Sequence, residues 1–350
     1  MFGHCVSLER LAADRYKRPI GPDTCMPGKV PPETLLESVF ARTGTADETV
    51  LQGPAEGEDA AAIDPPDGTL VVSTDPISLA ASAVGTLGVH IACNDVAASG
   101  GEPRWLTAVV MLPDEGSDLE TISTDLDAAA RAVGATIVGG HSEYVDALER
   151  PLVTLTAMGM TDRFVPTGGA EPGDRVLLTT AAGIEGTAIL AADFGDDLEV
   201  DEATIDRATD FLEEISILED ARAVREYATA MHDPTEGGVL AGLVELARAS
   251  DVRLEIDREA VPIRPATATL CEAAGVDPLC IFGSGGLLAT VPAARTDDTL
   301  EALSAAGIDG AVIGSVEAGD PVVDLGGKRL EHPVSDDLYP LWEAVDATES

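Results

Sequence analysis

Five short segments of the chain combine acidic residues or paired glycines with small, apolar neighbours. They are residues 57–61, 73–75, 94–95, 139–143 and 232–238. We expect each of them at a turn between regular elements. Because the chain holds 63 Asp and Glu residues, a single acid is most often solvated surface. The placement of three aspartates nevertheless indicates chemistry.

Asp59, Asp75 and Asp95 each stand beside apolar or small residues. A charged side chain is costly in such surroundings unless it has a partner. Carboxylates at strand ends beside glycine loops suit Mg²⁺ bridged to phosphate oxygens, because Mg²⁺ takes few protein carboxylates and completes its shell with phosphate and water. These three residues therefore predict a metal site that faces phosphate.

Two glycine pairs predict phosphate contacts. Gly139-Gly140 and Gly237-Gly238 allow backbone N–H groups to approach a phosphate, and the second pair stands at a predicted helix start, where the helix dipole also favours an anion. The chain has no GxxxxGK[ST] motif, which excludes a P-loop. It also has no GxGxxG after a predicted strand, which argues against a Rossmann cofactor.

Strands and helices alternate through about residue 162, which indicates an α/β arrangement. Hydrophobic periodicity predicts helices over residues 33–44, 81–98 and 118–134, and strands over 68–75, 105–113, 135–140 and 152–160. A second, α+β half follows, with a strand at 175–180, a long charged helical region at 201–228, a helix at 239–250 and strands at 285–292 and 310–316.

The Gly- and Pro-rich loop over residues 162–174 is the predicted boundary between the two halves. We predict one domain over residues 28–162 and a second over residues 170–340. Residues 1–27 show little periodicity and are expected to form a loose N-terminal extension. Met26 is a second candidate start codon, so we expect residues 1–25 to be dispensable.

The charge balance excludes whole classes of function. With a formal net charge of −42 and a pI near 4.1, the chain lacks the basic face that a nucleic-acid backbone binder needs. Its 45% hydrophobic residues argue against disorder. An acidic chain with only three lysines is typical of a high-salt cytoplasm, because dense counterions screen the repulsion. We interpret it as a protein of a halophilic archaeon.

The five cysteines form no CxxC pair, so the sequence predicts neither a disulfide framework nor a structural zinc site. Free thiols in a reducing cytoplasm are expected. The longest uncharged run, residues 76–94, is too polar for a membrane span, and charged residues interrupt any signal peptide at the start. We expect a cytoplasmic protein with no membrane and no nucleic-acid partner.

The motifs also resemble a known family. "GEDAAAI", "VVSTD", "GVHIACNDVAASGGEP", "IVGGHSE" and "HDPTEGG" stand in the order seen in the aminoimidazole ribonucleotide (AIR) synthase-like superfamily. The resemblance covers roughly residues 28–323. "MPGKVPPETL", "NDVAASGGEP" and "HDPTEGGVLAGLVELA" are most similar to the HypE-type and archaeal AIR-synthase-related branch.

The resemblance implies a two-domain α/β (α+β) fold, in which the N-terminal sheet forms a barrel across a homodimer and the C-terminal domain is α+β. It implies ATP in a cleft, with Mg²⁺ held by Asp59, Asp75 and Asp95. The implied nucleotide contacts are Asn94, Gly139, Gly140, His141, Glu143, Gly237 and Gly238. Asp233 is implied to face the phosphates, and Lys29 either contacts the transferred phosphoryl group or is an incidental exposed lysine.

The sequence departs from the family pattern at several points. Glu58-Asp59 replaces the usual pair of aspartates, which is a conservative change. HypE proteins end in a cysteine that receives a carbamoyl group, whereas this chain ends in "LWEAVDATES", so we do not transfer that reaction as it stands. For Cys93, a buried small hydrophobe is favoured over a site thiol. We interpret His90 and His232 as structural or as support for the ligands.

The sequence thus predicts an ATP- and Mg²⁺-dependent enzyme of the AIR synthase-like superfamily that phosphorylates an amide- or carboxylate-type oxygen. Positioning and charge neutralisation are the main requirements of phosphoryl transfer, and aspartates, Mg²⁺ and glycine backbone meet them. The alternatives are a small-molecule kinase similar to thiamine-monophosphate kinase and a nucleotide-binding regulatory protein without turnover. The acceptor, whether a small molecule or a protein, is not identified by the sequence.

Overall fold

The computed structural model describes residues 50–52, 55–64, 68–77, 83–113, 119–145 and 147–349. All of them belong to one compact unit of the chain. Lys29, the predicted N-terminal extension and the predicted helix over residues 33–44 lie outside the described residues.

The first sheet has six strands in the order β1-β2-β3-β6-β4-β5. Neighbouring strands are antiparallel except for β4 and β5, which run parallel. The strands are β1 Val50–Gln52, β2 Ala61–Ile63, β3 Thr69–Ile77, β4 Glu102–Leu112, β5 Thr136–Tyr144 and β6 Leu152–Thr161. The sheet does not close on itself, so a barrel across a dimer remains a prediction.

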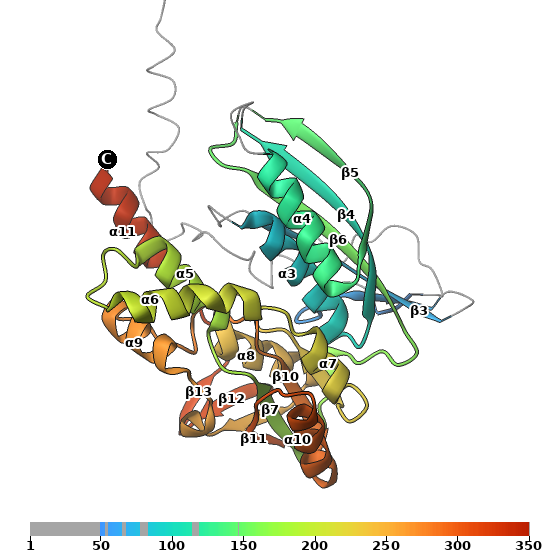
Figure 1. The fold of residues 1–350 in the computed structure, drawn as a ribbon. Coiled ribbons are helices and arrows are strands. Elements are labelled where there is room, and N and C mark those ends of the chain that lie inside the picture. The colour runs from blue at the N-terminus through green and yellow to red at the C-terminus, as the bar shows by residue number, and fades with distance from the viewer. Residues whose placement is uncertain are drawn as a thin grey trace, which may run out of the picture. The chain divides into compact units, whose positions relative to one another are not determined.

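Two helices cover one face of this sheet (Figure 1). Helix α3, Val84–Ala98, contacts β3 and β6, and α4, Leu119–Val133, packs on α3. Every second residue of β6 is buried beneath them, as expected for a strand with one covered face. Close packing needs small residues here: a Cβ on Gly88 would come within 2.5 Å of the Leu155 side chain.

The second sheet has seven strands in the order β13-β12-β9-β11-β7-β10-β8. Only the β12–β9 pair is parallel. The strands are β7 Asp174–Thr179, β8 Ala230–His232, β9 Arg253–Ile256, β10 Leu288–Pro292, β11 Gly310–Glu317, β12 Val322–Leu325 and β13 Lys328–Leu330.

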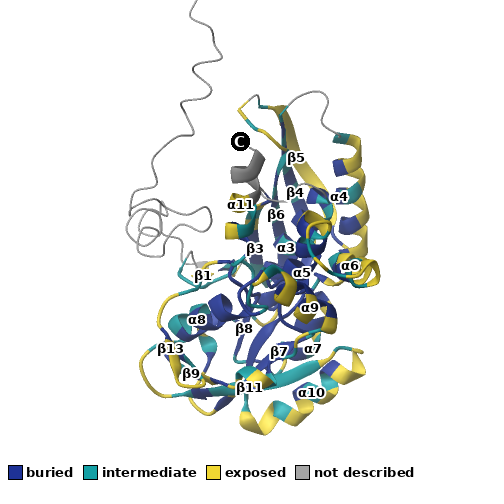
Figure 2. Cartoon of the chain, turned by 90° about the vertical axis from the view of Figure 1, so that its left-hand side faces the viewer, coloured by how far each residue is buried: buried dark blue, intermediate teal, exposed yellow. Residues whose placement is uncertain are grey.

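Helix α8, Gly238–Ser250, packs its leucines against this sheet and is almost wholly buried (Figure 2). Leu287 and Ala289 of the β10 region instead join a core with helix α7 and Leu303, while Leu288 joins the core with α8. Both faces of the sheet are therefore covered at β10. The other helices of this half are α5 Ile184–Phe194, α6 Glu202–Thr209, α7 Leu218–Val224, α9 Pro265–Ala274, α10 Thr296–Ala305 and α11 Tyr339–Glu349, with 3₁₀ turns η2 Thr167–Gly169, η3 Asp210–Glu214, η4 Arg258–Ala260 and η5 Ala293–Arg295.

The structure corrects three of the expected turns. Asn94 and Asp95 lie inside helix α3, and Asp75 lies within β3, which continues to Ile77. Gly139 and Gly140 lie within β5 rather than at its end. A Cβ on Gly140 would come within 2.0 Å of the Ala108 carbonyl oxygen, so this glycine allows β5 to approach β4 and does not make a turn.

Other expectations were incomplete. The helical region over residues 201–228 is interrupted and consists of α6, η3 and α7. Strands β9, β12 and β13 and helices α5, α9, α10 and α11 were not predicted. The predicted helix over residues 118–134 and the strands at 152–160 and 175–180 are confirmed within one or two residues.

Across the described ranges, no helix combines the length and the apolar character that a membrane crossing requires. Cys93, Cys271 and Cys280 are free and buried, as expected.

Candidate functional site

The loop that carries Asp59 is held by the second half of the chain. The Glu58 carboxylate accepts hydrogen bonds from the backbone N–H groups of Thr167 (3.4 Å) and Gly168 (3.3 Å). Arg248 of helix α8 forms an ion pair with Glu56 (2.8 Å). The loop approaches α8 so closely that a Cβ on Gly57 would lie 3.1 Å from a helix carbonyl oxygen.

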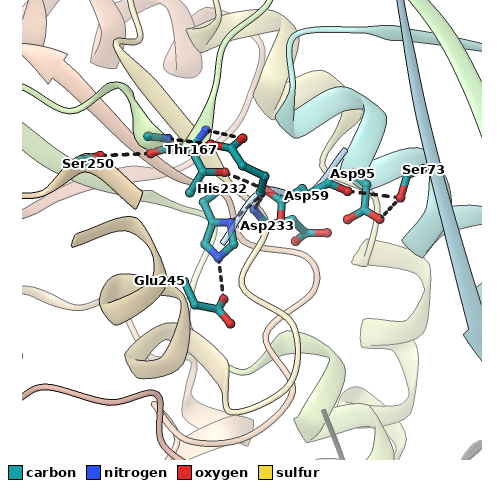
Figure 3. Close-up of polar contacts among 10 residues, drawn as sticks. Asp59, Ser73, Asp95, Thr167, His232, Asp233, Glu245 and Ser250 are labelled. Carbon is teal, nitrogen blue, oxygen red and sulfur yellow. Dashed lines mark hydrogen bonds and ion pairs between the residues drawn. The ribbon is translucent and has the colours of Figure 1, made fainter. Parts of the chain in front are cut away.

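Asp59 itself contacts His232 at the end of strand β8 (Figure 3). Its Oδ2 lies 2.9 Å from Nδ1 of His232 and also accepts from the Thr167 hydroxyl at 3.4 Å. The other ring nitrogen of His232, Nε2, lies 2.9 Å from a carboxylate oxygen of Glu245. Burial alone would lower the pKa of His232, but Asp59 and Glu245 outweigh it and raise the pKa to about 10.

Ser73 of strand β3 links the carboxylates of the first half. Its hydroxyl lies 2.6 Å from Oδ2 of Asp95 and 3.3 Å from Oδ2 of Asp75, and 3.2 Å from the backbone oxygen of Asp59. Ser73 and Asp75 share a face of β3 because side chains alternate along a strand. A strand, a helix and a loop therefore place three aspartates around one hydroxyl group.

Asp233 joins this group from the β8–α8 connection. Its backbone N–H donates to Oδ2 of Asp59 at 3.4 Å, and its side chain is buried. Neither carboxylate oxygen has a hydrogen bond of good geometry from the described residues. The Asn94 amide donates to the Ile215 carbonyl at 2.8 Å.

Electrostatics tie the four aspartates together. We call Asp59, Asp75, Asp95 and Asp233 the carboxylate cluster. Burial raises the pKa of Asp95 well above its ordinary value, and Asp75, Asp59 and Asp233 raise it further. Burial also raises the pKa of Asp233, followed by the charge of Asp59. The cluster is an arrangement of acids that a cation would stabilise.

Three other predicted site residues, Asn94, Gly237 and Gly238, form hydrogen bonds with groups of the chain itself. The Asn94 side chain donates to Ile215 and accepts from the Ile217 N–H at 3.0 Å, so it joins α3 to the segment before α7. The Gly237 N–H donates to the Asp336 carboxylate (2.9 Å), and the Gly238 N–H donates to the Thr235 carbonyl (3.0 Å). At the start of α8, a carboxylate of the chain thus takes the place expected for a phosphate.

The residues of β5 are not joined to the carboxylate cluster. Gly139, Gly140, His141 and Glu143 are exposed along the edge of the first sheet (Figure 2). His141 and Glu143 form an ion pair with each other at 3.5 Å. No hydrogen bond or ion pair among the described residues connects these four to the cluster.

Side chains alone do not form a metal site within the described residues. No three of their His, Cys, Asp or Glu side chains are arranged so that they could hold a metal ion. Mg²⁺ is commonly held by one or two carboxylates together with water and phosphate, so it does not need such a set. The two buried oxygens of Asp233 without a good partner fit a cation that arrives with its own ligands.

Three residues of the site were missed from the sequence. Ser73 stands two positions before Asp75, and the period of a strand could have indicated that both face one side. Glu245 is an acid in an otherwise apolar stretch of α8, which signals a partnered carboxylate. No sequence signal indicated Asp336, because its partner Gly237 lies 99 residues away.

Comparison with known proteins places this geometry in context. The chain matches the family models of AIR synthase related protein, the N-terminal domain over residues 57–161 and the C-terminal domain over residues 171–325. It is 31% identical over 331 residues to the carbamoyl dehydratase HypE of Rhizobium leguminosarum bv. viciae, covering 87% of this chain and 90% of the relative. It is 33% identical over 325 residues to the carbamoyl dehydratase HypE of Azotobacter vinelandii, covering 87% and 92%.

Solved structures share the fold. AaThiL complexed with AMPPCP and TMP, a thiamine monophosphate kinase from Aquifex aeolicus, superimposes with a TM-score of 0.67 at 25% identity, over 81% of this chain and 90% of that one. Escherichia coli HypE superimposes with a TM-score of 0.66 at 26% identity, over 81% and 92%.

Proposed function

The chain belongs to the AIR synthase-related family, and we propose that it is an ATP- and Mg²⁺-dependent enzyme that activates an amide- or carboxylate-type oxygen by phosphorylation. The relatives named carbamoyl dehydratase support this chemistry. Phosphorylation converts a carbonyl-type oxygen, which is a poor leaving group, into phosphate, which leaves readily. Loss of water from a carbamoyl group is one reaction that this activation allows.

One observation carries the proposal: four aspartates from separate elements meet at one place, where Asp95 and Asp233 are buried and Asp59 and Asp75 are partly exposed. Asp75 comes from β3, Asp95 from α3, Asp59 from a loop and Asp233 from the β8–α8 connection. A fold gains no stability by burying several acids together, because each buried charge must be desolvated and like charges repel. The cluster is better explained as a site that is completed by a bound cation.

The cluster would hold Mg²⁺ through one or two of the carboxylates of Asp59, Asp75 and Asp95, with water and phosphate as its other ligands, and Asp233 would face the nucleotide phosphates across the cation. The bound metal supplies charge neutralisation for the phosphoryl group that is transferred. The chain's own residues orient the carboxylates: Ser73 fixes Asp95 at 2.6 Å, and Thr167 and His232 fix Asp59.

The remaining site residues stay part of the proposal. Lys29 is proposed to contact the transferred phosphoryl group. The proposed nucleotide contacts are Asn94, Gly139, Gly140, His141, Glu143, Gly237 and Gly238. For Gly237 this requires the nucleotide to replace the Asp336 carboxylate as the acceptor of its N–H group.

A second candidate is a small-molecule kinase. AaThiL complexed with AMPPCP and TMP has the same fold over most of both chains, and AMPPCP is a triphosphate analogue. The two candidates differ in the fate of the phosphoryl group. A kinase leaves it on the product, whereas an enzyme that activates by phosphorylation releases it as inorganic phosphate.

We also propose that the protein is a cytoplasmic homodimer and that it comes from a halophilic cell. Strand β5 is exposed along its whole length, and Ile137, Val138 and Tyr144 lie uncovered on it. An exposed strand edge with apolar side chains is suited to pairing with another chain. Light scattering coupled to gel filtration in high salt tests this, and a monomer at micromolar concentration would contradict it.

The test of the proposed function is ATP turnover by the pure protein. ATP consumption and inorganic phosphate are measured with Mg²⁺ in high salt, alone and with amide, carbamoyl and carboxylate acceptors, and with thiamine monophosphate. The proposal predicts acceptor-dependent release of phosphate that EDTA abolishes. A phosphorylated product without release of phosphate supports the kinase. Binding of ATP without turnover under any condition would support a regulatory protein.

A further inference from the structure

We infer that His232 is the positioning residue of the carboxylate cluster: its imidazole, clamped between Asp59 and Glu245, fixes the Asp59 carboxylate where it meets Mg²⁺ and the nucleotide. This inference rests on the proposed function for its consequence in catalysis. The clamp itself rests on geometry alone.

The His232 imidazole has one acidic partner at each ring nitrogen. Asp59 and Glu245 each lie 2.9 Å from one ring nitrogen, and the His232 side chain is only 3% exposed. A ring N–H donates and a carboxylate oxygen accepts, so the imidazole bridges the two acids at a hydrogen-bond distance of 2.9 Å on each side.

The clamp joins the two halves of the chain at the site. Asp59 belongs to the loop before strand β2, whereas His232 ends β8 and Glu245 lies on α8. Figure 3 shows the three side chains in a row, with Asp59 between His232 and the group formed by Asp95 and Ser73. The Thr167 hydroxyl also donates to the Asp59 carboxylate, but at 3.4 Å this hydrogen bond is long.

Two substitutions separate the two sides of the clamp. In His232→Asn the amide nitrogen lies near the position of Nδ1 and keeps a donor toward Asp59. In His232→Gln it lies near Nε2 and keeps a donor toward Glu245. Both variants lose the ring and keep one amide donor, so the main difference between them is the partner that remains. His332→Leu, at an exposed histidine, is the control.

The first readout is hydrogen exchange of residues 55–64 without nucleotide, and the second is the affinity for Mg²⁺-ATP in high salt. We expect His232→Gln to show faster exchange in this segment and about tenfold or more weaker Mg²⁺-ATP binding, the scale of one charged hydrogen bond. His232→Asn should keep slow exchange and lie closer to the wild type in affinity. The KM for Mg²⁺-ATP should rise in His232→Gln. It should lie closer to the wild-type value in His232→Asn, which keeps the donor toward Asp59, and this difference indicates a positioning role.

Equal exchange and equal affinity in the two variants would overturn the inference, as would wild-type values in both. If either variant fails to fold, Glu245→Gln replaces it: a Gln amide donates to Nε2, the ring keeps its Nδ1–H toward Asp59, and exchange of residues 55–64 should stay slow. If the wild type binds no Mg²⁺-ATP, the proposed function fails, and the exchange data alone then confirm or overturn the role of His232.

Discussion

Replacing Asp95 by Asn separates a binding site from a buried structural acid. Asp95 lies on helix α3, is 7% exposed and lies 2.6 Å from the Ser73 hydroxyl. Asn has the same shape, and its carbonyl oxygen still accepts from Ser73. The substitution therefore removes one ionisable group and leaves the packing unchanged.

The expected effects have opposite signs. Burial and the neighbouring Asp75 raise the pKa of Asp95, so the apo protein gains nothing from its charge. The free energy of unfolding of Asp95→Asn without ligand should be equal to that of the wild type or higher. A lost contact between a charged group and a cation costs about 1.5–3 kcal/mol, which corresponds to about 10- to 150-fold weaker binding of Mg²⁺-ATP.

The assay is calorimetric titration of Mg²⁺-ATP at one high salt concentration, with urea unfolding of the same samples. Asp233→Asn tests a second member of the cluster in the same way. Asp206→Asn, at an exposed residue of α6, is the control and should stay within about 0.5 kcal/mol of the wild type in both measurements. Equal affinities in all four proteins would refute the reasoning. So would a large loss of apo stability in Asp95→Asn with unchanged binding.

Three further outcomes are expected. The unfolding midpoint should fall when KCl is lowered from molar to about 0.1 M, because the Debye length grows from about 3 to 10 Å around a chain with a net charge of −42; equal midpoints would reject a halophilic protein. Asn94→Ala should destabilise the protein by about 2–4 kcal/mol in urea, since the Ile215 and Ile217 backbone groups lose buried partners; a change below about 0.5 kcal/mol would contradict this. Burial raises the pKa of Asp336 to about 7, so its contribution to stability is present below the ordinary pKa of 3.8 and is lost as the pH rises through 7; the loss of stability between pH 4 and 8 should be smaller in Asp336→Asn than in the wild type, and an equal loss would contradict this.

The sequence predicted the acids of the site better than their surroundings. Asp59, Asp75 and Asp95 were singled out because they stand beside small apolar residues, and Asp233 was implied by the family resemblance; the structure brings the four together. That reasoning depends only on the cost of burying charge, which is local. The secondary structure predicted around these acids was less accurate. Asp95 was expected at a turn, but it lies in helix α3, whose small residues pack on the sheet.

Residues that act through distant partners could not be predicted from one sequence. His232 is separated from Asp59 by 173 residues, and Gly237 from Asp336 by 99. Glycines were ambiguous for another reason. Gly237 has the positive φ that a turn requires (76°), whereas Gly140 is needed only because the backbone of β4 passes close to it. In the sequence, a pair of glycines looks the same whether it forms a turn or allows two strands to approach each other.

The most direct test of the central claim is a crystal structure of the protein with a non-hydrolysable ATP analogue and Mn²⁺, whose anomalous scattering identifies the metal. The account predicts an anomalous peak within about 2.0–2.3 Å of a carboxylate oxygen of Asp59, Asp75 or Asp95. It also predicts that the nucleotide phosphates lie on the far side of the metal, facing Asp233. A metal bound elsewhere on the chain, or a nucleotide that leaves these four aspartates without a contact, would contradict it.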